Sequence, residues 1–253
     1  KGDFALQHFG FFATRDEVEA IEKGYRAFHH FDATHIALIA LAAAVIAGAV
    51  LVYRRLGTEG KNRFLTVLTV LLLLDELAKY AIAIGTDSWY WGYLPLHLCS
   101  INIFICLAYT VTKKDFFAEI LYGLCLPGAA IALFVPTWND LPILNAMHLH
   151  SASVHIMLTM YPLLLLSDGF KPNFRRLPKI FGLLAAVCIP IYFLNKRLGT
   201  NFFFLARTDG NPVLEMLAAV LGEKYFFLPR KFFFPRHIVL KVGKVTLKGI
   251  CCI

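Results

Sequence analysis

The chain has 253 residues, of which 58% are hydrophobic and 17% are charged, and its mean hydropathy is +0.63. Soluble domains are nearer half apolar and about one quarter charged, so this composition excludes an ordinary soluble domain and indicates a multi-pass membrane protein. The formal net charge of +8 does not indicate nucleic-acid binding, because the basic residues occupy the connections between apolar runs. We therefore expect membrane lipids as partners and no nucleic acid.

A charged N-terminal segment, residues 1–33, precedes six long apolar runs. Its stretch TRDEVEAIEKGYRAF predicts either a short amphipathic helix on the membrane surface or solvated, partly ordered backbone. A helix of about 20 apolar residues crosses the roughly 30 Å core of a bilayer. We therefore predict an all-α fold over residues 34–228, a polytopic membrane helix bundle with six transmembrane helices, in which Pro127 kinks the fourth. The six runs are residues 34–53, 64–84, 95–112, 116–135, 147–166 and 178–194.

Lysine and arginine are unequally divided between alternate connections. The connections after the second and fourth runs contain neither residue and carry three tryptophans, as an interfacial belt would: Trp89, Trp91 and Trp138. Because basic connections stay on the cytoplasmic side, the N-terminus is predicted to lie outside. The connections after the first, third and fifth runs hold ten basic residues: Arg54, Arg55, Lys61, Arg63, Lys113, Lys114, Lys171, Arg175, Arg176 and Lys179.

The last 25 residues, 229–253, depart from this pattern. They contain six Lys or Arg, no acidic residue and no apolar run of 20 residues. After an outside start, six helices would leave this basic segment outside, against the positive-inside rule. Two hypotheses follow: the C-terminus is truncated or out of frame relative to the ancestral gene, or it is a native basic tail that contacts lipid headgroups.

Ionisable side chains inside membrane spans are costly, and this makes them functional candidates. At about 1.5 Å of rise per residue, polar groups of four runs fall in the outer half of the bilayer. This shared depth predicts a site between the helices, and the alternative is scattered polar packing. The residues concerned are His35, Asp75, Glu76, Lys79, Cys99, Asn102, His148 and His155.

Spacing predicts how some of these side chains are directed. Asp75 and Lys79 are four residues apart and are expected to form a structural ion pair, while Glu76 lies about 100° round the helix and is expected to orient a histidine. On the fifth run His148 and His155 share one polar stripe. His150 falls on the opposite side and is expected at the level of the headgroups.

Cys99 is the candidate nucleophile. Pro95 suits the first turn of a helix, which would put Cys99 at the end of that turn, where the helix dipole favours the reactive thiolate. His97 is two residues away, about 200° round the axis, so it is expected to face elsewhere and to act in support. A base must then come from another helix, with His155 or His148 as donor. The alternative is an inert buried cysteine.

At these residues the chain resembles the YwaF-like bacterial integral membrane proteins, which are related to the eukaryotic transmembrane-protein-164 group. The resemblance covers residues from about 9 to 228. It is carried by FFATRDE, FHHFDATHIALIAL, LPLHLCSINIF, HLHSASVHIMLTMYPLLLL and LGTNFFFL. The eukaryotic group is described as a phospholipid acyltransferase that acts through an acyl-cysteine intermediate with a histidine partner.

The resemblance implies that Cys99 is the nucleophile and that His155, followed seven residues later by Pro162, is its partner. It also implies a phospholipid or fatty-acyl substrate and the plasma membrane of a bacterium. The family has a seventh helix that is not found after residue 228, which favours the damaged-tail hypothesis.

Three functions are consistent with these patterns. The first is a lipid acyltransferase or acyl hydrolase with Cys99 and His155 as catalytic residues, Asn102 or helix N–H groups at the oxyanion, and no metal or other cofactor. The second is a metal or haem site, although no HExxH or CxxC motif is present. The third is a non-enzymatic transporter or lipid-binding protein that uses the charged residues of the second run. The supporting residues of the first are Asn102, His148, Glu76, His97 and His35, and the ligands of the second are His35, His148, His155 and Glu76.

Overall fold

The computed structural model describes residues 10–209, 211–221, 240–242 and 245–247. All six apolar runs are helical, as predicted. The long helices are α3 (Ala33–Arg55), α4 (Thr58–Gly85), α5 (Leu98–Thr112), α8 (Ala146–Ser167) and α9 (Leu177–Leu198). The fourth run is divided into α6 (Asp115–Ile120), the π-helical turn η2 (Leu121–Cys125) and α7 (Leu126–Phe134). Shorter elements are α2 (Arg15–Ile21), α10 (Pro212–Leu221) and the 3-10 turns η1 (Trp91–Tyr93), η3 (Phe174–Arg176) and η4 (Phe202–Phe204).

Five helical segments of the described chain are long and apolar enough to cross a bilayer, which confirms a multi-pass membrane protein. α4 is longer than any of them, but its apolar part carries three charged side chains. The five segments are Ala33–Arg55, Trp91–Thr112, Asp115–Phe134, Ala146–Ser167 and Phe174–Leu198. The two hypotheses about residues 229–253 lie mostly outside the described residues. Of this segment the structure describes only two antiparallel strands, β1 (Leu240–Val242) and β2 (Val245–Leu247).

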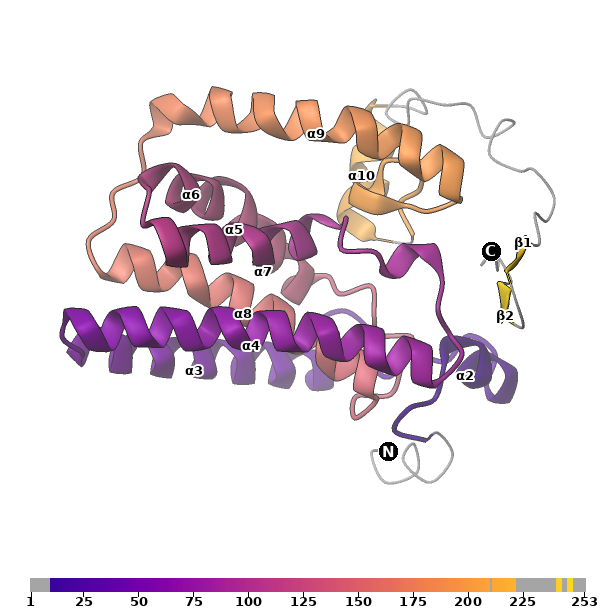
Figure 1. Ribbon diagram of the computed structural model, residues 1–253. Coiled ribbons are helices and arrows are strands. Elements are labelled where there is room, and N and C mark those ends of the chain that lie inside the picture. The colour runs from indigo at the N-terminus through magenta and orange to yellow at the C-terminus, as the bar shows by residue number, and fades with distance from the viewer. Residues whose placement is uncertain (1–9, 210, 222–239, 243–244, 248–253) are drawn as a thin grey trace.

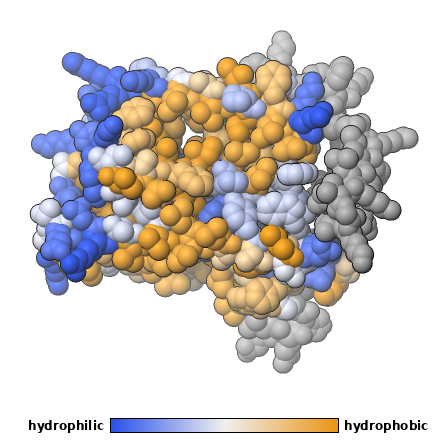
Figure 2. All heavy atoms as spheres, in the orientation of Figure 1, coloured by the Kyte–Doolittle hydropathy of each residue, from blue (hydrophilic) through white to orange (hydrophobic). Residues whose placement is uncertain are grey.

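α8 is the central helix of the bundle. α3 and α4 run side by side along one side of it, α5 and α7 pack on the other, and α9 lies outermost (Figure 1). Hydrophilic residues gather at the end where α3 leads into α4, next to a broad hydrophobic band (Figure 2). This division of the surface is what a bilayer and one of its headgroup layers require.

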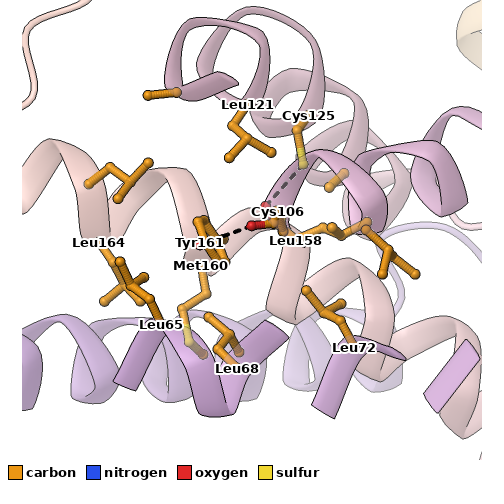
Figure 3. Close-up of a cluster of buried hydrophobic side chains, with 14 of the residues drawn as sticks. Leu65, Leu68, Leu72, Cys106, Leu121, Cys125, Leu158, Met160, Tyr161 and Leu164 are labelled. Carbon is orange, nitrogen blue, oxygen red and sulfur yellow. Dashed lines mark hydrogen bonds between the residues drawn. The ribbon is translucent and has the colours of Figure 1, made fainter. Parts of the chain in front are cut away.

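The main core joins α4, α5, the α6–α7 segment and α8 (Figure 3). Pro162 lies inside α8, where its ring nitrogen cannot donate to the carbonyl of Leu158. The thiol of Cys125, at the end of η2, donates to that carbonyl at 3.4 Å instead. The backbone of the fourth run is therefore irregular at the π turn η2, which precedes Pro127. This turn places the Cys125 thiol as a donor against the Leu158 carbonyl, which lacks its helical partner because of Pro162.

The N-terminal segment packs on the connection between α7 and α8. α2 begins with a reciprocal capping box between Thr14 and Glu17, and its buried Val18 packs against Leu141. α3 begins at its cap Asp32, whose carboxylate accepts from the backbone N–H groups of His35 at 2.8 Å and His29 at 3.0 Å. These N–H groups, His35 first, lower the pKa of the Asp32 carboxyl, so the cap is ionised above acidic pH.

Candidate active site

Cys99 lies closer to the start of its helix than predicted. The placement of Pro95 in the first turn is wrong, because η1 and the bend after it keep residues 94–96 outside the helix. α5 begins at Leu98 with His97 as its N-cap, so Cys99 is the second helical residue. The backbone N–H groups of this first turn have no partner within the helix, and the positive end of the helix dipole is nearest here.

The side chain of Cys99 meets that of His155 on α8. Sγ of Cys99 lies 3.1 Å from Nε2 of His155, and the other ring nitrogen, Nδ1, lies 2.6 Å from the backbone carbonyl of Ser151. A carbonyl oxygen can only accept, so Nδ1 carries the ring proton and Nε2 presents its lone pair to the thiol. The arrangement holds the imidazole in the tautomer that can take the proton of Cys99.

A tryptophan covers one face of the same imidazole. Trp138, in the connection between α7 and α8, stacks on His155 with ring centroids 4.7 Å apart and an interplanar angle of 19°. Trp138 is buried, so its assignment to an interfacial belt is wrong. The stack and the bond to Ser151 together restrict the orientation of the ring. Because the connection has no periodic pattern, nothing in the sequence indicated this contact.

The two supporting residues on α5 face in different directions. The His97 ring packs edge-to-face on Phe202 of η4, with centroids 4.9 Å apart, and this confirms that it faces away from Cys99. Asn102 is buried and lies three residues after Cys99 on the same helix face. Of the two, Asn102 is the one directed to the same side of α5 as the thiol.

The buried ion pair of α4 joins Lys79 to Glu76, so the predicted Asp75–Lys79 pair is wrong. Lys79 Nζ lies 2.5 Å from Oε1 of Glu76, and both side chains are buried. Oε2 of Glu76 accepts from the Ser100 hydroxyl at 3.4 Å. Because Ser100 follows Cys99, Glu76 links α4 to the first turn of α5 and does not orient a histidine.

We expect Lys79→Met to lower the free energy of unfolding by about 3 kcal/mol, because Glu76 would keep a buried charge without its cation. The double variant Glu76→Gln/Lys79→Met should recover most of this loss. Chemical unfolding of the detergent-solubilised protein measures both. Lys61→Met is the matched control, since Lys61 and Asp168 form a partly exposed pair at 2.5 Å that should contribute about 1 kcal/mol or less. A double variant as unstable as the single one would contradict this account.

Asp75 belongs to a different cluster, with two residues of α8. Its Oδ2 accepts from the hydroxyl of Ser153 at 3.0 Å. Nδ1 of His150 lies 3.2 Å from the same oxygen, so His150 contacts Asp75 and not the Cys99–His155 pair. The contact between Asp75 and Ser153 was not predicted from the sequence. An argument that the second run packs against the fifth could have brought Asp75 close to Ser153.

His35 and His148 have structural roles at the N-terminal ends of α3 and α8. Nδ1 of His35 accepts from the backbone N–H of Phe31 at 2.9 Å, and Nε2 lies 3.1 Å from the carbonyl of Leu133. Nδ1 of His148 lies 3.0 Å from the carbonyl of Leu141. Both rings are buried and anchor the polypeptide that covers this end of the bundle. His155, not His148, is therefore the histidine that reaches Cys99.

A cavity of about 460 Å³ lies between α3, α4 and α8, and we call it the α3–α4–α8 cavity. Its volume is within the range of about 300–1,000 Å³ that is usual for small-molecule sites. Trp138 lines this cavity and stacks on His155, so one aromatic side chain is common to the cavity and the Cys99–His155 pair. Its polar lining is His35, Asp75, His148, His150 and Ser153, and its apolar lining includes Phe28, Ala42, Ala78, Ile82, Leu133 and Ile156.

The proposed metal ligands are not gathered into one site. Within the part of the chain that the structure describes, no group of three or more His, Cys, Asp or Glu side chains is arranged to hold a metal ion. The nitrogens of His35 are both engaged with backbone groups, and Glu76 is engaged with Lys79. This arrangement does not support a metal or haem site built from His35, His148, His155 and Glu76.

Comparison with known proteins identifies the family. Neither a curated protein nor a solved structure is found to match the chain. The sequence profile of the TMEM164 family matches residues 30–233, which include all six apolar runs and both members of the Cys99–His155 pair. The chain therefore belongs to the TMEM164 family and is a multi-pass membrane protein of that family.

Proposed function

We propose that the protein is a lipid acyltransferase or acyl hydrolase that forms an acyl-enzyme on Cys99, with His155 as general base. The observation that carries the proposal is the 3.1 Å contact between Sγ and Nε2, together with the anchored Nδ1 of His155. A thiol paired with a base in the correct tautomer is the arrangement that activates a cysteine nucleophile. The position of Cys99 in the first turn of α5 adds the helix dipole to this activation.

The reaction proceeds in two halves. Nε2 of His155 takes the thiol proton, and the sulfur attacks the carbonyl carbon of a lipid ester. When the tetrahedral intermediate collapses, the C–O bond breaks and the departing alkoxide takes the proton from Nε2, which leaves a thioester. A lipid hydroxyl or water, deprotonated by His155, then attacks the thioester, and Cys99 leaves as a thiol by regaining that proton. Free backbone N–H groups of the first turn of α5 and the amide of Asn102 are the proposed oxyanion donors.

The α3–α4–α8 cavity is the proposed site of an aliphatic chain of the substrate. Its lining is mainly apolar, and Trp138 connects it to His155. A lipid whose chain occupied the cavity would have its ester near the outer ends of α5 and α8, at the depth of Cys99. Holding the ester close to the thiol is the positioning contribution that a catalytic site needs.

We expect Ala42→Phe to fill part of this cavity and to reduce turnover of long-chain lipid esters about tenfold, with a smaller effect on short-chain esters. Ala42 is buried on α3 and lines the cavity. Ala44→Phe is the control, since Ala44 is exposed on the same helix and does not line the cavity. The measurement is the ratio of kcat/KM for long and short chains. An unchanged ratio in Ala42→Phe would contradict the assignment of the chain site.

For topology, we propose that α4 is a sixth membrane span and that the N-terminus lies outside, in the plasma membrane of a bacterium. At 28 residues α4 is about 42 Å long, enough to cross a core of roughly 30 Å. Its charges are compensated within the bundle by the Glu76–Lys79 pair and by the contacts of Asp75. The separation of basic from uncharged connections supports the orientation, and the resemblance to YwaF-like proteins supports the choice of membrane.

The proposal is tested by looking for the acyl-enzyme directly. The purified protein is incubated with a phospholipid, and intact-mass spectrometry should show an added acyl mass that hydroxylamine removes, as it does from a thioester. Adding a lysophospholipid should discharge the adduct to a phospholipid if the enzyme is a transferase, and to free fatty acid alone if it is a hydrolase. Retention of lipid without any covalent adduct would instead favour a non-enzymatic lipid-binding protein, which the cavity would also suit.

A further inference from the structure

A second pocket lies at the opposite end of the bundle from Cys99, where α6 and the start of α9 meet. It has a volume of about 380 Å³ and is lined by Phe116, Arg176, Lys179 and Ile180. We call it the basic pocket. In Figures 1 and 2, α6 and the start of α9 lie at the end of the bundle where hydrophilic residues gather. Nothing in the proposed reaction uses the basic pocket.

The two cations of the basic pocket are incompletely neutralised. Arg176 Nη1 is 3.8 Å from Oε1 of Glu119, and both oxygens of that carboxylate already accept from the backbone N–H of Asn173, at 3.1 and 3.2 Å. Lys179 Nζ lies 5.4 Å above the ring of Phe116 and, among the described residues, forms no ion pair with a carboxylate. The basic pocket therefore has a positive electrostatic potential, which favours the binding of an anion.

The other wall of the pocket is apolar. Ile180 is buried against Ile120 and Leu124, and Phe116 packs against the same cluster. A hydrated inorganic anion would gain nothing from these side chains, whereas the glycerol and first methylene groups of a lipid would bury apolar surface on them. The combination of two cations with an apolar wall at a bilayer surface matches an amphiphilic anion.

We propose that the basic pocket binds the headgroup of an anionic phospholipid, with its phosphate between Arg176 and Lys179. The depth is suitable, because Lys179 lies in the first turn of α9, at the end of a membrane-spanning segment. α9 exposes much of its surface, and its Leu177 and Ile180 pack beside Gly123 of η2. A lipid in this pocket would add to the contacts between α9 and the bundle.

The proposal is tested with the full chain in detergent, titrated with phosphatidylglycerol or with phosphatidylcholine and followed by native mass spectrometry. We expect one phosphatidylglycerol to bind preferentially. Arg176→Gln/Lys179→Gln should weaken its binding roughly 30-fold, given the usual contribution of a basic side chain to anionic-lipid binding. The control is Lys171→Gln/Arg175→Gln, which removes the same charge from two exposed residues outside the pocket and should leave binding almost unchanged.

Three results would overturn the proposal. Equal weakening in both double variants would mean that a diffuse positive field attracts the lipid. Equal binding of phosphatidylcholine would remove the role of net lipid charge. Displacement of the lipid by millimolar inorganic phosphate would identify a site for the free ion. The experiment involves no acyl transfer, so its outcome does not depend on whether Cys99 is a nucleophile.

Discussion

Replacement of Cys99 by serine is expected to abolish the hydroxylamine-sensitive adduct and to lower the rate of acyl transfer by about four orders of magnitude. The serine hydroxyl is a far weaker acid than a thiol, and at this position His155 receives no help from a carboxylate, because its Nδ1 is bonded to the carbonyl of Ser151. A neutral backbone carbonyl orients the imidazole, but it stabilises the protonated imidazole less than a carboxylate would. Losses of this size are usual when a covalent nucleophile is removed.

The control for this experiment is Cys188→Ser. Cys188 is a free, partly buried cysteine on α9, outside the candidate site. Its replacement should leave both the adduct and the rate unchanged. If Cys99→Ser still carried the acyl mass while folding normally, Cys99 would have no place in the mechanism.

His155→Gln is expected to lower the rate of adduct formation by about 10³-fold, within the range usual for loss of a general base. Glutamine is polar and of similar length, but it cannot accept the proton of Cys99. Alkylation of Cys99 by a lipid-soluble thiol reagent at neutral pH should slow in parallel, because the base that takes the thiol proton is lost. The rate of this alkylation measures activation of the thiol independently of any lipid substrate.

His150→Gln is the matched control, since His150 is on the same helix and lies against Asp75. It should retain the alkylation rate of Cys99. A similar slowing in both variants would mean that the effect arises from general disturbance of α8, and that His155 has no specific role as the base.

The helices and the residue types of the site could be predicted from the sequence, because both depend on local properties. Long apolar runs predict spans regardless of what they pack against. The prediction that His97 faces away from Cys99 is confirmed, although His97 is the non-helical N-cap of α5 and the separation therefore does not arise from helical periodicity. The two helices that meet at Cys99 and His155 could likewise be chosen from their polar residues.

Side-chain pairing could not be predicted in the same way, because it depends on neighbouring helices. Lys79 is within reach of both Asp75 and Glu76 along α4, and the choice is made by what faces each carboxylate. Glu76 faces Ser100 of α5, whereas Asp75 faces Ser153 of α8. Sequence spacing contains no information on how α4 is rotated against these helices.

Two further differences arise from irregular backbone. Trp138 lies in a connection without periodicity, so no pattern could bring it to His155. The start of α5 is delayed to Leu98 because η1 and the bend after it occupy the residues where Pro95 would have begun a helix. Prolines indicate where a helix is permitted to begin, and tertiary contacts decide whether it does.

Pro162 lies between two parts of α8 that have different roles. The part of α8 from Tyr161 onward is held by a chain of hydroxyls, with Tyr161 bonded to Thr110 at 2.7 Å and Thr110 to Thr69 at 2.8 Å, and by Leu164 and Leu165, which are buried in the main core. The half before it carries Ser151 and the imidazole of His155. Mutation can therefore alter the chemistry of one half while the other preserves the architecture. Among family members that act on different substrates, we expect the sequence of α8 to vary most before Pro162 and least after it.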